Sequence, residues 1–218
     1  MSIKYGPDIV KSNLTCLFDS VNVKSYPGSG NTWTDLSGNG NNATKSGGVS
    51  YNSGYMSFDG SGYFYTDTSK VTVNKTAYTK MAFIYVTNFN YSNNIISGGT
   101  DAHAFWLGGG NTLKMGHNGS WYLAQTTTTM SLNQWYFVAG TFNTTDGHKV
   151  YHNGVLEGSS NNVGTWSTSA NDTYIGAFSA ANNFSGKINN VMVYNRALTD
   201  SEIMQNFNAL RGRYSLWV

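Results

Sequence analysis

Hydrolysis of a glycosidic bond needs two carboxylate side chains, one on each side of the bond. The chain holds two glutamates, Glu157 and Glu202, and nine aspartates that stand singly along the sequence. Glu157 ends a hairpin pattern, and Glu202 stands three residues after Thr199, the spacing of a helix capping box. No pair stands where such a reaction would need it, so we expect that the protein is not an enzyme.

Four histidines and one cysteine are the candidate metal ligands and nucleophiles. His148 and His152 lie four residues apart on one strand pattern and would share a face. They are open to two interpretations, a zinc pair or solvated hairpin residues. Cys16 lies among apolar neighbours and is expected to be a buried core thiol. A single cysteine excludes an intramolecular disulfide and a Cys-x-x-Cys metal site.

The stretch SYPGSGNTWTDLSGNGNN (25–42) could offer oxygen ligands to a hard cation. Calcium takes about six to eight oxygens from carboxylates, amides and backbone carbonyls in a flexible shell. The candidate calcium ligands are Asp35, Asn39, Asn41 and Asp59. The alternative is that Asp35 forms an Asx-turn and caps its own loop. In both cases we expect a rigid loop, anchored by Tyr26, Trp33 and Leu36.

Aromatic side chains beside small polar residues could bind sugars, because a sugar ring offers both an apolar face and hydroxyl groups. Three stretches combine these features: DAHAFWLGGGN (101–111), HNGSWYLAQ (117–125) and VGTWSTSAND (163–172). The candidate carbohydrate-binding residues are Trp166, Trp106, Trp121, Tyr122, His103 and Asn118. For the tryptophans on strand patterns, a place in the core is the competing interpretation.

The elements that must position these residues are short strands. Runs of four to eight residues rich in Tyr, Phe, Val, Ile and Thr alternate with Gly, Asn and Ser clusters, which is typical of a β-sandwich. Asn153-Gly154 is a strong signal for a tight hairpin, and His117-Asn118-Gly119 offers a second. Both prolines precede residue 28, so no proline interrupts the later strands.

One helix is predicted near the end of the chain, over 199–211. Thr199 is a natural N-cap, and Ile203, Phe207 and Leu210 recur at helical spacing. Gly212 can serve as the residue that ends the helix.

The composition also indicates which partners and locations to expect. Charged residues make up 11% of the chain and the net charge is +2, with no cluster of Lys and Arg, so nucleic acid is not an expected partner. No window has the roughly 18 apolar residues of a membrane span, and the first residues show no signal peptide. Without a linker or a change of composition, we expect a single domain over 1–218.

The order of these segments resembles a known family. The segments that carry the similarity are KSYPGSGNTWTDLSGNGNNAT, FDGSGYFYT, NQWYFVAGTFN, VYHNGVLEG and a closing block with VYNRALTDSEIMQNF. The chain is similar to concanavalin A-like, laminin-G-like (LamG-type, pentraxin-like) jelly-roll domains. The YGPDIV opening and the RGRY ending resemble stand-alone modules of tailed-bacteriophage virion proteins. The resemblance implies an all-β jelly roll of two packed antiparallel sheets with one short C-terminal helix. It also implies binding rather than catalysis, often of carbohydrate and often with one calcium ion.

We therefore expect a structural or adhesive module on the surface of a phage particle, as a capsid decoration or tail-associated protein. Its expected partners are other virion proteins, host-surface glycans and further copies of itself. The alternative is a free, calcium-assisted lectin. An N-terminal arm (1–13) and an apolar tail (212–218) are the expected contact segments, since neighbouring ends would form one patch. The alternative is that the tail folds back on its own sandwich. The expected interface residues are Tyr5, Ile9, Tyr214, Leu216 and Trp217.

Overall fold

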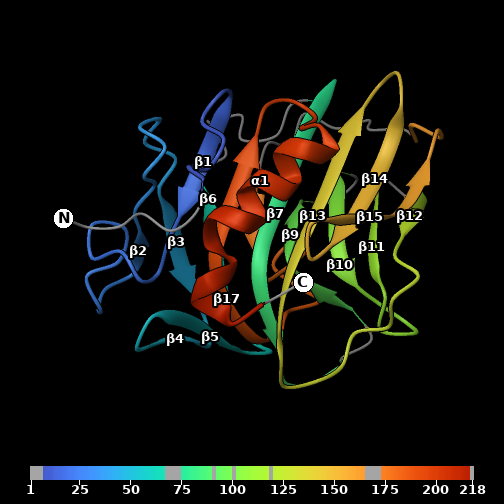
Figure 1. Ribbon diagram of the computed structural model, residues 1–218. Coiled ribbons are helices and arrows are strands. Elements are labelled where there is room, and N and C mark those ends of the chain that lie inside the picture. Colours follow the sequence, from blue (N-terminus) through green and yellow to red (C-terminus); the bar gives the residue numbers. More distant parts are fainter. Residues whose placement is uncertain are drawn as a thin grey trace.

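The computed structural model describes residues 7–66, 75–89, 92–99, 102–117, 120–164 and 173–216. These residues form two layers of antiparallel strands with one short α-helix on the outside (Figure 1). The predicted all-β sandwich with a C-terminal helix is confirmed. In the described part of the chain, no helix has the length and apolar character to cross a membrane.

The first layer is a single sheet of eight strands. Its order is β15-β14-β13-β7-β17-β5-β4, and β1 pairs with the second half of β17 while β5 pairs with the first half. The strands are β1 (Leu14–Phe18), β4 (Val49–Asn52), β5 (Tyr55–Asp59), β7 (Ala77–Val86), β13 (Trp135–Asn143), β14 (Gly147–His152), β15 (Val155–Ser160) and β17 (Ser185–Tyr194).

The second layer consists of two smaller sheets. One has the order β12-β11-β10-β8 and the other β2-β3-β6-β16-β9. The strands are β2 (Thr32–Trp33), β3 (Ala43–Ser46), β6 (Tyr63–Thr66), β8 (Asn93–Asn94), β9 (Ile96–Gly98), β10 (His103–Leu107), β11 (Leu113–His117), β12 (Ser120–Gln125) and β16 (Thr173–Ile175).

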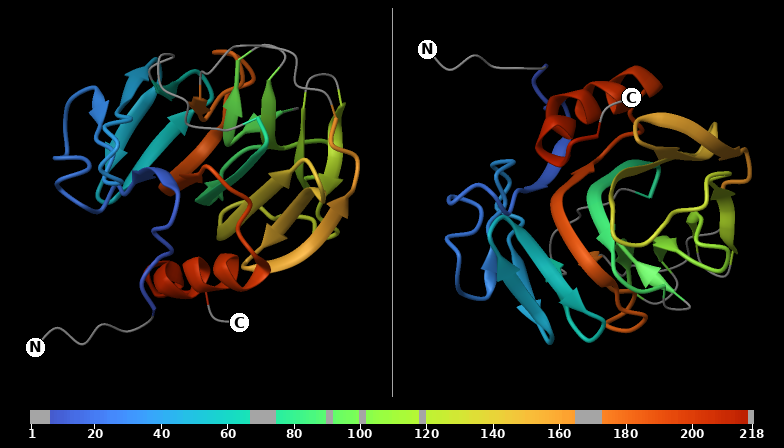
Figure 2. Two further views of the ribbon diagram at one scale, coloured as in Figure 1. Left: turned by 90° about the horizontal axis from the view of Figure 1, so that it is seen from above. Right: turned by 60° about the horizontal axis from the view of Figure 1, so that its bottom comes forward.

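The central strand β7 is buried on both faces, which divides the hydrophobic residues into two clusters. Ala82 and Ile84 face the second layer and join the core between the sheets. Met81 and Phe83 point the other way, into a second core beneath the helix α1 (Asp200–Leu210). Figure 2 shows α1 outside the sandwich, against the eight-stranded sheet. The helix is thus the third layer of this part of the molecule.

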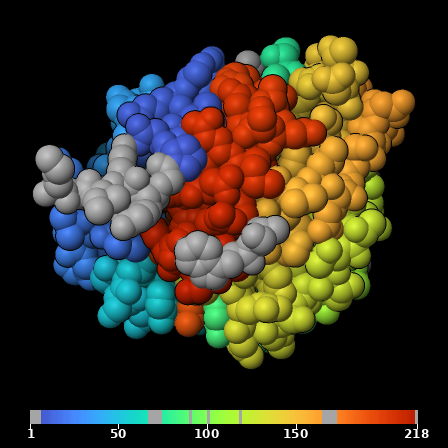
Figure 3. Space-filling view, viewed as in Figure 1, coloured from blue at the N-terminus to red at the C-terminus, as the bar shows by residue number. Residues whose placement is uncertain are grey.

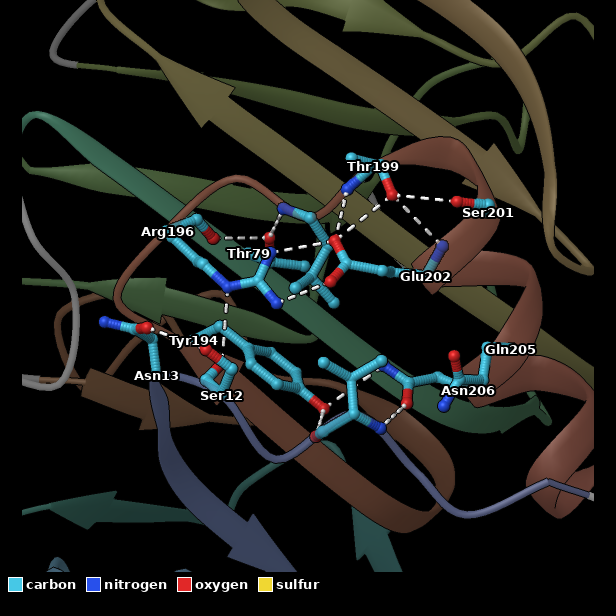
Figure 4. A network of polar contacts seen from close by, with 12 residues as sticks. Ser12, Asn13, Thr79, Tyr194, Arg196, Thr199, Ser201, Glu202, Gln205 and Asn206 are labelled. Atoms are coloured by element: carbon cyan, nitrogen blue, oxygen red, sulfur yellow. Dashed lines mark hydrogen bonds and ion pairs between the residues drawn. The ribbon is translucent and has the colours of Figure 1, made fainter.

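The predicted capping box of the helix is present. The Thr199 hydroxyl accepts the Glu202 N–H, and the Glu202 carboxylate accepts the Thr199 N–H. Arg196 adds a two-pronged contact to the same carboxylate, at 2.8 and 2.6 Å (Figure 4). Sequence reasoning misplaced the other end. The chain continues as a 3-10 turn (Arg211–Tyr214), and the left-handed residue is Ser215 (φ 55°) rather than Gly212.

Asn206 ties the start of the chain to this helix. Its side-chain oxygen accepts the Val10 N–H at 2.8 Å, and its amide donates to the Tyr194 hydroxyl at 3.1 Å. The same hydroxyl donates to the Val10 carbonyl at 2.8 Å (Figure 4). The buried amide therefore fixes Val10 beside the helix through specific hydrogen bonds, and residues 7–13 lie beside α1 on this face (Figure 3).

The apolar tail packs on its own domain in the described residues. The Tyr214 ring stacks on Phe83, with ring centres 4.0 Å apart, and is 9% exposed. Ile9 and Leu216 are partly buried against the same cluster. The expectation that Tyr214 forms an exposed contact patch is therefore wrong, because its ring fills the core beneath the 3-10 turn. Tyr5 and Trp217 lie outside the described residues.

The predicted Asn153-Gly154 hairpin joins β14 to β15. Both residues have positive φ, 49° and 83°, as a tight turn of this kind requires. The second predicted hairpin joins β11 to β12, and its Asn118 and Gly119 lie outside the described residues.

Candidate functional site

A pocket opens on the outer face of the second layer, and strand alternation decides which side chains line it. On β10, Phe105 and Leu107 point into the core between the layers and are buried. Ala104 and Trp106 must therefore point to the opposite face, since side chains alternate along a strand. Trp106 stays 7% exposed, because other side chains stand around it.

Strand β12 and the loop after β16 supply the walls. The Tyr122 ring lies 5.5 Å from the Trp106 ring and is 59% exposed. A shift of register between β11 and β12 accompanies this arrangement on the outer face. The half-buried Trp121 meets Phe178 edge to face, with ring centres 5.3 Å apart. Two pairs of aromatic rings thus face one hollow.

Amides and a hydroxyl complete the lining. Asn94 pairs with Trp106 across β8 and β10 and donates to the Asn182 carbonyl at 3.1 Å. It also donates to the Ser92 hydroxyl at 3.1 Å, and its oxygen accepts from Ser97 at 2.8 Å. The pocket measures about 230 Å³ and is lined by Ser92, Asn94, Ala104, Trp106, Trp121, Tyr122, Phe178 and Asn182. Its size suits one sugar ring rather than a larger cofactor, since pockets for larger ligands start at about 300 Å³.

The lining carries no charged side chain among the described residues. Lys114 lies nearby, with its ammonium group 5.7 Å from the centre of the Trp106 ring. That group is already bound by the Gly109 carbonyl at 2.8 Å and the Thr112 hydroxyl at 2.6 Å. The pocket therefore offers aromatic faces and neutral hydrogen-bonding groups, which is the chemistry that a neutral sugar needs.

The structure brings three of the six predicted carbohydrate-binding residues together: Trp106, Trp121 and Tyr122 line one pocket. Trp166 and Asn118 lie outside the described residues. Sequence reasoning missed Asn94, Phe178 and Asn182. The only signal was their place in segments rich in Asn, Ser and Gly, and such segments recur throughout this chain.

His103 does not belong to the pocket, and this prediction is wrong. It alternates with Ala104 and so points inward, where it is 2% exposed and contacts the ammonium group of Lys80. Lys80 is fully buried and donates to the Ile96 carbonyl at 3.0 Å. Burial, reinforced by Lys80 and His117, lowers the pKa of His103 well below its ordinary value.

Two more histidines lie in the same interior cluster. His117 contacts the Tyr78 hydroxyl at 2.7 Å, and its ring centre is 4.5 Å from that of His148. Burial lowers the pKa of His117 to about 3 and that of His148 to about 4. Burial likewise lowers the pKa of Lys80. Burial thus disfavours the protonated form of every basic group in this cluster.

Of the two interpretations of His148 and His152, the structure contradicts the solvated one, and the zinc pair stays a prediction. His148 is fully buried beside Phe142, while the half-buried His152 lies 3.0 Å from the Glu157 carboxylate. They are therefore not solvated hairpin residues. Among the described residues, no group of three or more His, Cys, Asp or Glu side chains is arranged to hold a metal ion.

Asp35 organises its own loop. One carboxylate oxygen accepts the N–H groups of Leu17 (2.9 Å) and Ser37 (2.8 Å), and the other accepts the Ser37 hydroxyl (2.7 Å) and the Asn41 N–H (3.0 Å). The contact with Ser37 is the Asx-turn that was the alternative interpretation. Trp33 and Tyr26 anchor the loop in the core, and Leu36 is half-buried.

The other candidate calcium ligands are also engaged. Asn41 and Asn39 turn their amide nitrogens, not their oxygens, toward backbone carbonyls of β1. Asp59 accepts two hydrogen bonds from Ser61 at the end of β5. Four donors around one carboxylate do not fit a cation, which needs those lone pairs for itself. These hydrogen bonds favour the structural loop, and calcium titration decides between the two interpretations.

The sequence profile of a family described as the concanavalin A-like lectin/glucanases superfamily matches residues 58–204. No curated protein matches the chain.

Several solved structures share the fold. A Trypanosoma rangeli sialidase mutant that displays trans-sialidase activity is 18% identical, with a TM-score of 0.71 over 94% of this chain and 34% of that one. Domain 4 of AbnA, a GH43 extracellular arabinanase from Geobacillus stearothermophilus, in complex with arabinotriose, is 19% identical, with a TM-score of 0.69 over 90% and 98%. A structure on botulinum neurotoxin type C, whose cell entry depends on two ganglioside molecules, is 18% identical, with a TM-score of 0.65 over 92% and 52%.

These identities are too low to show more than a shared fold. The chain spans about a third of the length of the sialidase and nearly all of the arabinanase domain.

We predict that Asp35→Ala lowers the thermal midpoint equally in calcium and in a chelator. Losing the acceptor of four hydrogen bonds should cost about 3 kcal/mol, or roughly 6–12 °C. The matched control is Asp146→Ala, which removes an exposed carboxylate that is not a candidate ligand and should cost about 0.5 kcal/mol. If calcium instead stabilises the wild type and Asp35→Ala abolishes that gain, the loop is a calcium site.

We also predict that acid destabilises the protein through its buried histidines. Their folded-state pKa values lie below the ordinary 6.5, so the unfolded chain binds more protons between pH 6.5 and 4. The free energy of unfolding should therefore fall as the pH falls through this window, by up to about 1.4 kcal/mol per pH unit and histidine.

Denaturant titrations at several pH values measure this slope, and His148→Phe should reduce it. Because burial causes the shifts, 1 M salt should leave most of the slope in place, whereas a slope from surface charges would be screened. A flat profile between pH 6.5 and 4 would contradict the assigned role of the cluster.

Proposed function

The chain belongs to the concanavalin A-like lectin/glucanases superfamily, and from that premise we propose that it is a non-catalytic carbohydrate-binding module. The observation that carries the proposal is the pocket, where Trp106, Trp121 and Tyr122 meet two asparagines without a charged side chain. Aromatic rings stack on the C–H face of a sugar, while amides bind its hydroxyl groups. The same fold is seen with arabinotriose in the arabinanase domain, which agrees with this use of it.

The state of the two glutamates supports a non-catalytic role. Burial alone would raise the pKa of Glu157, but hydrogen bonds from Thr128 and the nearby His152 lower it overall. Arg196 is the main cause that lowers the pKa of Glu202 to about 2. A glycosidase needs one carboxyl group whose pKa is raised, so that it can donate a proton. Hydrolysis of β-glucan, alginate or chitin oligosaccharides that is lost in Glu157→Gln would contradict this part of the proposal.

We further propose that the module belongs to a bacteriophage virion, as a capsid decoration or tail-associated protein, rather than being a free lectin. The proposal rests on the opening and closing residues, which resemble phage modules. It is supported by the arrangement of the faces. The N-terminal segment and the 3-10 turn lie on the α1 side of the eight-stranded sheet, and the pocket opens on the outer face of the other layer. A module held by its ends would leave the pocket open to glycans.

We predict that binding of neutral oligosaccharides depends on the pocket. Tyr122→Ala and Trp121→Ala should each weaken binding about tenfold or more, because each removes an aromatic wall. Val23→Ala, at a side chain that is 75% exposed, is the control and should bind as the wild type does. Isothermal titration with arabino-, xylo- and cello-oligosaccharides measures the change. Equal affinity in all variants would reject the pocket as the site.

We predict, second, that the protein sediments with phage particles at a fixed copy number. Purified particles, separated on a density gradient and analysed by quantitative mass spectrometry, give the ratio to the major capsid protein. A protein that stays in the soluble fraction, while still binding glycans, would favour the free lectin.

A further inference from the structure

A second group of aromatic rings lies on the outer face of the same layer. Tyr63 and Tyr65 on β6 and Tyr174 on β16 form it, and together they are called the tyrosine platform here. The ring centres are 5.5 Å apart for Tyr63 and Tyr174, 6.2 Å for Tyr63 and Tyr65, and 6.5 Å for Tyr65 and Tyr174. Between them in sequence, Phe64 points into the core and is fully buried.

The platform is partly open and has hydroxyl groups beside it on one neighbouring strand. Tyr65 is 37% exposed, and Tyr63 and Tyr174 are half-buried. On the neighbouring β3, the residues opposite Tyr65 and Tyr63 are Thr44 and Ser46. The surface therefore combines exposed aromatic faces with neutral hydroxyls, the same chemistry as the pocket lining.

The platform and the pocket belong to one continuous face. Tyr174 lies opposite Ser97 of β9. The Ser97 hydroxyl donates to Asn94 at 2.8 Å and accepts the Phe105 N–H at 3.1 Å, which joins β9 to β8 and β10. Asn94 lines the pocket, as does Phe178, four residues after Tyr174 in the loop that leaves β16. A single row of neighbouring strands thus carries both aromatic groups.

We infer that the tyrosine platform binds further sugar rings of the same neutral oligosaccharide whose one ring occupies the pocket. This inference rests on the proposed function. The pocket is small, at about 230 Å³, whereas the tilted rings of the platform lie on an open face where Tyr65 is 37% exposed. Such an open face suits a sugar chain that continues beyond the pocket. Tyrosine stacks on a sugar face and keeps its hydroxyl for a hydrogen bond. The competing explanation is that the three rings only stabilise the sheet through cross-strand contacts.

The experiment compares chain lengths. Isothermal titration with arabinose, arabinotriose and arabinohexaose, and with the matching xylose and glucose series, is performed on the wild type, Tyr65→Ala, Tyr65→Phe, Tyr122→Ala and Val155→Ala. Val155 is an exposed apolar strand residue of the other layer and serves as the matched control. Thermal melting of every variant separates loss of folding from loss of binding.

We expect wild-type affinity to rise with chain length. Tyr65→Ala should remove that rise, with about a fivefold to tenfold loss for the hexasaccharide and no loss for the shortest ligand that binds. Tyr65→Phe should keep most of the rise, because it keeps the ring. Tyr122→Ala should weaken all lengths alike.

Three results would overturn the inference. First, Tyr65→Ala could bind the hexasaccharide as tightly as the wild type while Tyr122→Ala binds it weakly. That result would keep the pocket as the binding site and reject the platform. A lower midpoint of Tyr65→Ala with unchanged affinity would assign the rings to sheet stability alone. No binding of any length by the wild type would reject the proposed function and the platform together.

Discussion

The burial of strand β7 on both faces is the constraint on which the rest of the structure depends. Its alternate residues feed two separate cores, one between the layers and one beneath α1. An eight-stranded sheet whose centre is apolar on both faces needs a cover on each side. The second layer covers one face. The helix, with the residues before β1 and the 3-10 turn, covers the other, so both ends of the described chain lie on the same side.

Because the second layer covers the sheet with its inner face only, its outer face remains free for binding. The residues of β10 that do not enter the core, Ala104 and Trp106, become the floor of the pocket. The residues of β6 and β16 that do not enter the core become the tyrosine platform. The same strand alternation that builds the core therefore also places the side chains of the pocket and the platform on the outer face. To bind a sugar there, each surface needs only side chains of suitable chemistry.

The interior between the layers contains a cluster of buried basic side chains. Lys80 and three histidines sit between the layers without ordinary solvation, and their pKa values are lowered because burial disfavours the charged forms. Burying a polar group costs free energy unless it forms hydrogen bonds. The bond from Lys80 to the Ile96 carbonyl offsets part of this cost. Protonation of these groups is therefore disfavoured in the folded state.

The sequence alone determined the β-sandwich, the hairpin at Asn153-Gly154 and the capped helix after Thr199, because alternation, turn residues and caps are local signals. It also placed Trp106, Trp121 and Tyr122 among the binding candidates, since strand aromatics beside loops are visible in the chain. It could not tell that His103 points inward, that Tyr214 stacks on Phe83, or that Asp35 is surrounded by donors. Only the tertiary structure decided these points, because the face a side chain takes depends on strand register, and its partners come from segments far away in the chain.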